Sequence, residues 1–287
     1  MKEQVFDMLN NQPEERALKT NSDPAVQNVE QERATATQAT ALVTAVDRLL
    51  VILETFHRVQ KPLSLTDLAE LAGIPKSSCH AIVGTLTARG YLYSLTRPRA
   101  LYPTRRLYDI AQGIQENDPF VERAMPLLER LRDSSRETVI LGKRQGDAVI
   151  YLQVVESTNA IRYSAKSGEF KPLHSSSIGK ALLGSLKEAE MRAQIGRLAT
   201  PAITDHTLTA PEHLEQDILE GRRRGYYVTR GENVADVWAV AASFTFNSET
   251  LAIAIAGPRH RMESSVGEYA QLLSAACSVI SRQWAWS

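Results

Sequence analysis

Between residues 43 and 56, apolar residues recur every three or four positions, which predicts an amphipathic helix that ends close to His57. They are Val43, Val46, Leu49, Leu50, Leu53 and Phe56. A shorter helix is predicted over residues 64–72, where Ser64 is a plausible N-cap and Asp67 follows three residues later. Gly73 then suits the left-handed residue of a tight turn.

A third helix is predicted from Pro75 to Gly90, because proline is tolerated at a first helical position and glycine favours a helix end. We expect its apolar face to contain Ala81, Ile82 and Leu86. A short helix, a glycine turn and a helix with a polar start are typical of a helix-turn-helix, whose second helix enters the DNA major groove. Small or extended polar side chains there can reach base edges and phosphates.

Two short runs, 91–93 and 100–102, surround a basic turn and predict a β-hairpin wing. Its Arg97 and Arg99 are expected to contact the phosphate backbone or the minor groove. An alternative is a three-helix unit that binds a protein. Arg105, at the start of the linker, could contact DNA phosphates or equally only cover the surface. The candidate contacts with double-stranded DNA are Thr66, Lys76, Ser77, Ser78, His80, Thr85, Arg89, Arg97, Arg99 and Arg105.

The chain divides by pattern into four parts: a polar tail over 1–40, a winged helix-turn-helix over 41–104, a linker helix over 105–118 and a larger domain over 119–287. The larger domain begins and ends with helices, which are predicted over 119–134 and 261–283. Between them we expect strands at 138–141, 148–155, 160–165, 226–228, 237–246 and 251–256, and helices at 176–186, 187–196 and 211–224. Strands in groups, followed by helices and more strands, favour an α/β (α+β) domain with a mostly antiparallel sheet. The two terminal helices are expected to pack across one sheet face.

A serine-rich loop in this domain, residues 172–177, leads directly into a predicted helix. Free backbone N–H groups and the helix dipole at such a point suit a carboxylate. Simple N-capping by Ser175 or Ser176 is the plainer alternative. The sequence Gly179-Lys180-Ala181 departs from a phosphate-binding loop, and no serine-hydrolase or metal-ligand motif is present. We therefore expect neither catalysis nor a cofactor nor a bound metal.

The net charge of the whole chain is zero, because it has 33 basic and 33 acidic residues. The net charge of each segment is more informative. Residues 1–40 carry a net charge of −3, residues 41–114 of +4 and residues 115–287 of −1. A local basic excess thus coincides with the predicted helix-turn-helix. The composition of 1–40 predicts a mostly disordered tail. The two isolated cysteines, and the absence of a signal-peptide or membrane-spanning pattern, favour a cytoplasmic protein.

Several motifs in order resemble the IclR-type transcriptional regulators, over about residues 43–283. They are Leu65–Ser78, Pro172–Leu183, Arg224-Gly225-Tyr226 with Gly231-Glu232, Val237–Ala242 and Gly257-Pro258. The resemblance implies a GAF/PAS-like effector domain and a regulator that forms dimers or dimers of dimers on palindromic operators. It also implies a small organic acid as effector, and we expect the protein to be a repressor. The alternative is a metabolite-binding protein or enzyme whose N-terminal part mediates protein contacts.

Carried over by position, the resemblance implies an effector pocket in the larger domain. Alanine at positions 254 and 256, where relatives that bind very small oxo-acids have serine, predicts a more apolar pocket and an aromatic or larger carboxylate from a catabolic pathway. Asp236 and Ser243-Phe244 depart from the family pattern. The implied pocket residues are Tyr163, His174, Ser175, Ser176, Ser177, Ile178, Asp236, Trp238, Ala239, Ala254 and Ala256.

Overall fold

The computed structural model describes residues 43–97, 99–117 and 119–283; the predicted tail over 1–40 lies outside this range. The first part consists of helices α2 (Thr44–Val59), α3 (Leu65–Leu71) and α4 (Lys76–Ala88), followed by strands β1 (Leu92–Leu95) and β2 (Ala100–Pro103). The strands form an antiparallel hairpin. Three helices and a hairpin around one small apolar core confirm the predicted helix-turn-helix with its wing.

Local chemistry explains where these helices begin and end. The Ser64 hydroxyl accepts a hydrogen bond from the Asp67 N–H at 3.1 Å and donates one to the Asp67 carboxylate at 2.8 Å, which caps α3 as predicted. Gly73 has a φ of 64°, the left-handed value that the turn before α4 requires. The predicted apolar face of α4 is wrong in one respect, because Ala81 is exposed. The buried face is formed by Cys79, Val83 and Leu86. The spacing of four and three residues defines that buried stripe.

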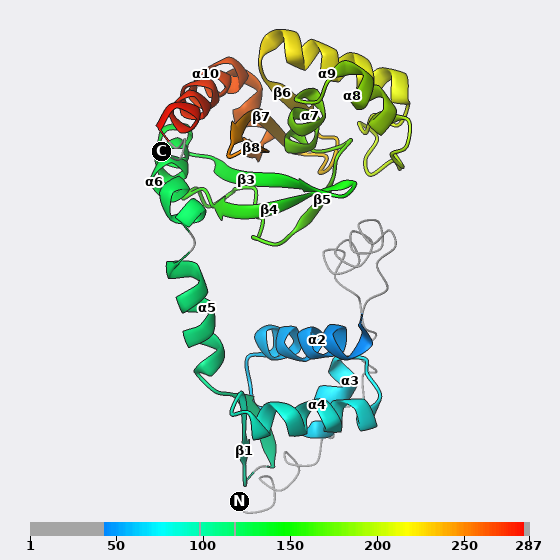
Figure 1. Ribbon diagram of the computed structural model, residues 1–287, viewed down its shortest axis with the longest axis vertical. Coiled ribbons are helices and arrows are strands. Elements are labelled where there is room, and N and C mark those ends of the chain that lie inside the picture. The colour runs from blue at the N-terminus through cyan, green and yellow to red at the C-terminus, as the bar shows by residue number, and fades with distance from the viewer. Residues whose placement is uncertain (1–42, 98, 118, 284–287) are drawn as a thin grey trace, which may run out of the picture.

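A helix connects the two folded parts of the chain. Helix α5 (Arg106–Glu116) runs between the helix-turn-helix and the large sheet (Figure 1). It has no buried residue, and the side chains of Ile110 and Ile114 are 43% and 70% exposed. The predicted linker helix therefore has exposed apolar side chains that cover no other surface in the described part of the chain.

The second part contains one six-stranded sheet in which every neighbouring pair is antiparallel, as predicted. The strand order is β5-β4-β3-β8-β7-β6. Strand bounds are Thr138–Gln145 for β3, Ala148–Val155 for β4, Phe170–Pro172 for β5, Tyr227–Arg230 for β6, Val237–Phe246 for β7 and Glu249–Pro258 for β8.

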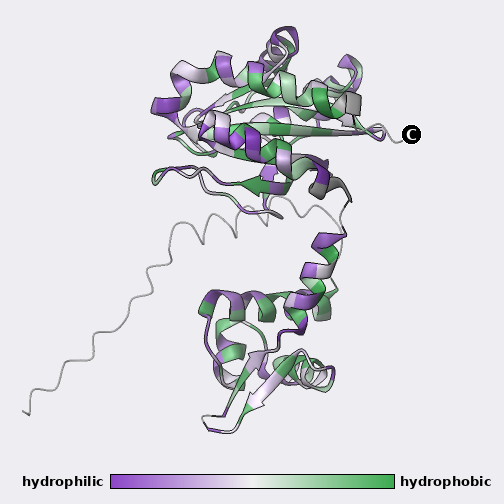
Figure 2. Ribbon diagram, turned by 90° about the vertical axis from the view of Figure 1, so that its left-hand side faces the viewer, coloured by the Kyte–Doolittle hydropathy of each residue, from purple (hydrophilic) through white to green (hydrophobic). Residues whose placement is uncertain are grey.

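Helices cover both faces of this sheet (Figure 1). On one face lie α6 (Pro119–Ser135) and α10 (Arg259–Gln283), which confirms the predicted packing of the terminal helices. The other face is covered by α7 (Ser177–Gly184), α8 (Glu188–Ile195) and α9 (Pro211–Arg224). Hydrophobic colour concentrates in the sheet between these layers (Figure 2). In the described part of the chain, no helix is long and apolar enough to cross a bilayer.

The predicted strand over 160–165 is wrong, and the short strand β5 was not predicted. Residues 160–165 form a loop whose carbonyls bond to side chains: Thr138 Oγ1 donates to Tyr163 O at 2.5 Å, and Arg261 Nη2 donates to Ile161 O at 2.9 Å. Alternation of apolar residues alone misled the prediction, because a strand also needs a partner strand for its backbone groups.

Candidate functional site

The serine-rich loop leads into α7 as predicted. Ser176 Oγ accepts a hydrogen bond from the Gly179 N–H at 3.0 Å and donates one to the Pro172 carbonyl at 2.9 Å. The first N–H groups of a helix lack partners within the helix and carry the positive end of its dipole. Gly179 is required here, because a Cβ would lie 2.2 Å from the Leu173 carbonyl oxygen. This close approach holds the loop against the start of the helix.

A small cavity lies beside the start of α7. Its volume is about 30 Å³, room for roughly two water molecules, since each needs about 10–15 Å³ by this kind of measure. Of the residues expected at the effector pocket, seven line the cavity: Tyr163, Ser175, Ser176, Ser177, Ala239, Ala254 and Ala256. Six further lining residues were not predicted: Ile140, Tyr151, Thr229, Asn233, Val234 and Val237.

Four residues expected at the pocket do not line the cavity. Trp238 lies between Val237 and Ala239, which do line it, and alternation along β7 directs its ring to the opposite sheet face. There the guanidinium groups of Arg230 and Arg259 lie 5.5 and 5.8 Å from the indole ring. Asp236 is exposed. The period-two pattern of β7 contained the signal that separates Trp238 from its neighbours.

The other two residues outside the lining are buried in the wall. Ile178 belongs to the apolar core beneath α7. His174 Nε2 lies 3.1 Å from the Pro201 carbonyl oxygen, and burial lowers the pKa of this imidazole. A neutral His174 with a protonated Nε2 fits that contact. Both residues therefore support the loop rather than face the cavity.

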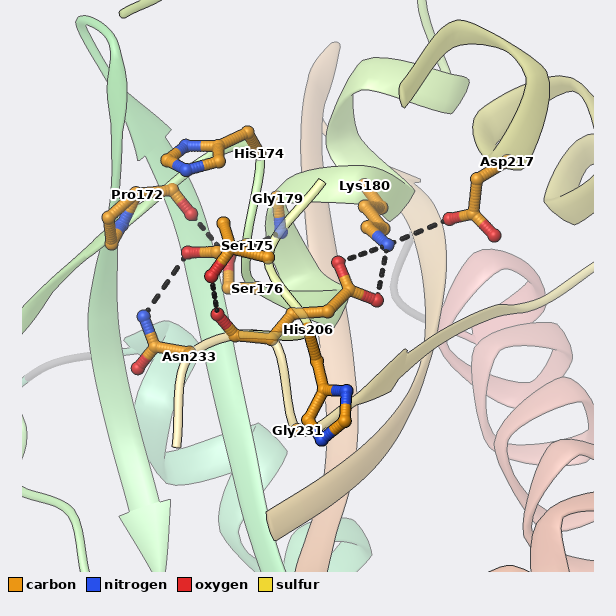
Figure 3. A network of polar contacts seen from close by, with 12 residues as sticks. Pro172, His174, Ser175, Ser176, Gly179, Lys180, His206, Asp217, Gly231 and Asn233 are labelled. Carbon is orange, nitrogen blue, oxygen red and sulfur yellow. Dashed lines mark hydrogen bonds and ion pairs between the residues drawn. The ribbon is translucent and has the colours of Figure 1, made fainter. Parts of the chain in front are cut away.

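A buried ion pair supports the same region and was not predicted. The Lys180 ammonium, fully buried on α7, lies 2.8 Å from an Asp217 carboxylate oxygen and 2.7 Å from Glu232 Oε1. Figure 3 shows Lys180 directed towards Asp217, and Asn233 towards Ser175. Burial raises the pKa of Glu232 against the opposing effect of Lys180. No local motif could reveal this cluster, because the partners of Lys180 lie far away along the chain.

The cavity offers hydrogen bonds and no charge of its own. Its polar groups are the hydroxyls of three serines, Thr229 and two tyrosines, together with the Asn233 amide, and no lining residue is ionised at neutral pH. Donors at a helix start can bind a small anion without a basic side chain. In the described residues no group of three or more His, Cys, Asp or Glu is arranged to hold a metal.

A second concave surface lies between α4 and the hairpin. This groove, of about 1220 Å³, is lined by four of the predicted DNA contacts: Thr66, Lys76, His80 and Arg99. Five others lie outside its lining but are exposed: Ser77, Thr85, Arg89, Arg97 and Arg105. An i,i+4 ion pair joins Arg105 to Asp109 at 3.2 Å.

Ser78 differs from the other predicted contacts. Its side chain is only partly exposed, and its Oγ accepts a hydrogen bond from Arg48 Nη1 of α2 at 2.8 Å. The bond leaves the Ser78 hydroxyl proton free to be donated elsewhere. Arg48 was not among the predicted residues, although it connects α2 to the first turn of α4.

Comparison with known proteins agrees with this architecture. The family model for the IclR helix-turn-helix domain matches residues 45–95, and the model described as "Bacterial transcriptional regulator IclR C-terminal" matches residues 114–282. The chain is 33% identical to the HTH-type transcriptional regulator BhcR of Paracoccus denitrificans, over 78% of this chain and 80% of that protein. It is 29% identical to the transcriptional repressor IclR of Escherichia coli, over 84% and 90%.

A solved structure resembles the whole described fold. It is an IclR homolog from Microbacterium hydrocarbonoxydans complexed with 4-hydroxybenzoate, with a TM-score of 0.65 and 23% identity, covering 83% of this chain and 97% of that one. At this identity the likeness establishes the fold. The relatives named here regulate transcription.

Proposed function

Because the chain belongs to the IclR family of bacterial transcriptional regulators, we propose that it is a cytoplasmic repressor that releases a palindromic operator when it binds an organic carboxylate. Members of this family regulate transcription in response to a ligand. The observation that carries the proposal is one chain with both a basic groove beside α4 and a cavity at the start of α7. The repressor role is supported by the relative from Escherichia coli, itself a transcriptional repressor.

The DNA-binding part is supported by the surface of α4 and the hairpin. Lys76 and His80 on α4 and Arg99 on the hairpin line one groove, so base-reading and phosphate-binding groups face the same space. We propose that α4 enters the major groove and that the hairpin arginines contact the backbone. Exposed Ser77, Arg89 and Arg97 extend this surface.

Self-association is supported by apolar side chains that nothing in the described chain covers. The exposed fractions of Val43, the N-cap residue of α2, and of Val46 and Leu50 within the helix are 67%, 53% and 52%. On α5 Ile110 and Ile114 are 43% and 70% exposed. The spacing of three and four residues places these side chains on one face of each helix, and exposed apolar faces mark interaction sites. We propose that these faces pair in a dimer, which presents two α4 helices to a two-fold symmetric operator, and that two dimers can associate.

The effector is proposed to be an aromatic or other larger carboxylate from a catabolic pathway. Ala239, Ala254 and Ala256 make one wall apolar, and the solved relative is complexed with 4-hydroxybenzoate. A benzene ring occupies a cavity of about 150 Å³ in a protein core, so the cavity must enlarge from about 30 Å³ to accept one. An aromatic effector therefore requires movement of a cavity wall.

A thermal-shift screen of the full chain tests the effector class. Benzoate and 4-hydroxybenzoate are expected to raise the melting temperature and to release bound upstream DNA, whereas acetate and glyoxylate act more weakly. Stabilisation by acetate or glyoxylate alone would contradict an aromatic effector while leaving DNA binding intact.

A further inference from the structure

We propose that Asn233 determines the size of the effector that the cavity admits, because it holds the cap segment, residues 233–235, closed over the cavity. The inference rests on the proposed effector function of this cavity. The cap segment lies in the connection between β6 and β7, and its Asn233 and Val234 both line the cavity. Val234 is also 39% exposed, so the cap segment is a thin wall between the cavity and solvent.

The chain on the β6 side of the cap segment is firmly held. The Gly231 carbonyl accepts a hydrogen bond from Thr204 Oγ1 at 2.6 Å, and the Glu232 carbonyl accepts one from Thr207 Oγ1 at 2.7 Å. The Glu232 side chain is bound to the buried Lys180 ammonium. Movement that opens the cavity is therefore expected to begin after residue 232.

The chain on the β7 side is held as well. The Gly231 N–H donates to the Val237 carbonyl at 3.0 Å, which closes the base of the connection, and the Arg259 N–H donates to the Asp236 carbonyl at 2.7 Å. Both bonds lie outside residues 233–235, and a third, from the Val237 N–H to the Val234 carbonyl at 3.0 Å, joins the cap segment to the start of β7. Displacement of the cap segment breaks this turn bond and enlarges the cavity, while the paired strands of the sheet stay intact.

One side-chain hydrogen bond joins the cap segment to the opposite wall: Asn233 Nδ2 donates to Ser175 Oγ at 3.2 Å (Figure 3). Because this bond links neutral groups, it holds the cap segment more weakly than the Lys180–Glu232 ion pair holds the preceding residue. Ser175 immediately precedes the N-cap of α7, and because its Oγ accepts in this bond, its proton stays available to a carboxylate at the helix start. A ligand small enough to leave the cap segment in place can therefore bind Ser175 without displacing Asn233.

The consequence is selection by size. A two-carbon acid is close to the existing volume and can bind with the cap segment closed. An aromatic acid exceeds it and must displace the cap segment, which requires the Asn233–Ser175 bond to break. Asn233 thus slows the entry of large acids and leaves the entry of small ones almost unchanged.

Asn233→Ala and Val234→Ala in the full chain separate the hydrogen bond from the cavity volume, since the second enlarges the cavity and keeps the bond. Stopped-flow binding with benzoate and glyoxylate is the first measurement. Asn233→Ala is expected to raise the association rate constant about three- to tenfold for benzoate, the effect of losing one neutral hydrogen bond, and less than twofold for glyoxylate. Val234→Ala is expected to change mainly dissociation. Equal effects of Asn233→Ala on both acids, or none, would overturn the proposal.

Amide hydrogen exchange without effector provides an independent readout. The Val237 amide, whose N–H donates to the Val234 carbonyl of the cap segment, is expected to exchange about three- to tenfold faster in Asn233→Ala than in the unaltered protein. Asn233→Asp should restore slow exchange, because the Ser175 hydroxyl can donate to the carboxylate. Unchanged exchange in Asn233→Ala would contradict the closing role of Asn233. If neither acid binds any variant, the proposed effector class fails, and the exchange result alone decides whether Asn233 closes the cavity.

Discussion

Lys180 and Glu232 form a buried ion pair that connects the start of α7 to the segment closing the cavity. The Lys180 ammonium lies 2.7 Å from Glu232 Oε1 and 2.6 Å from Oε2, although only the first contact has hydrogen-bond geometry. Asp217 of α9 approaches the same ammonium. One cation thus holds two carboxylates from different elements. Removal of that cation leaves two like charges together in a poorly hydrated place.

Replacement of Lys180 by methionine is expected to destabilise the protein by about 3–5 kcal/mol, the usual effect of breaking a buried ion pair on one side. Urea unfolding followed by circular dichroism measures this. Lys187→Met, at an exposed position before α8, is the matched control and should change stability by less than about 0.5 kcal/mol. Similar small effects of both substitutions would show that the pair does not stabilise the fold.

Gly179 is expected to tolerate no side chain. Its Cβ would meet backbone atoms of Leu173 at 2.2–2.7 Å, which cannot move away as a flexible side chain could. Gly179→Ala should therefore cost about 1–3 kcal/mol through overpacking and weaken effector binding. Gly267→Ala, in an open position of α10, should instead stabilise the protein by about 0.5–1 kcal/mol. Thermal unfolding of the two variants compares them, and stabilisation by both would disprove the close approach.

His174 is expected to make the protein less stable as the pH falls. Burial lowers the pKa of its imidazole below the usual value of 6.5, so the unfolded chain binds a proton more readily than the folded chain below that pH. The contribution is lost as the pH falls through 6.5, at no more than about 1.4 kcal/mol per pH unit. His174→Gln, which keeps a donor for Pro201, should flatten the dependence of unfolding free energy between pH 7.5 and 5.5. Exposed His213→Gln should leave it unchanged; equal slopes in all three proteins would exclude His174 as the cause.

Arg48 is expected to affect operator choice through Ser78. Because Arg48 occupies an acceptor site of the Ser78 hydroxyl, the hydroxyl is left to donate, which suits an acceptor on a base edge or a phosphate. Arg48→Met and Ser78→Ala should change preference at the same operator position, with a coupling of about 0.5–3 kcal/mol in a double-mutant cycle. Binding measured on operators varied one base pair at a time tests this. Additive effects at different positions would separate the two residues.

The elements were largely predictable because their signals are local. The Ser64 and Ser176 caps, the hairpin turn at Gly146-Asp147 and the periodicities of α9 and β7 all act within a few residues. The predicted strand over 160–165 failed because pairing depends on distant backbone. The cavity was found from the serine-rich loop, but Asn233 and Thr229 were not, since only the fold brings β6 and its following loop to that place. The buried ion pair of Lys180 could not be predicted either, because only the fold brings Asp217 and Glu232 next to it.

Fluorescence anisotropy of the full chain on its own upstream DNA, titrated at several salt concentrations, tests DNA recognition by α4 and the hairpin most directly. We predict tighter binding than to shuffled DNA and a steep salt dependence. Arg99→Ala should weaken binding to both DNAs and reduce the log–log salt slope by about 1–2, because each lost phosphate contact contributes about 0.9 and a dimer loses two. Equal affinity for upstream and shuffled DNA at low salt, with no effect of Arg99→Ala, would contradict the proposed function.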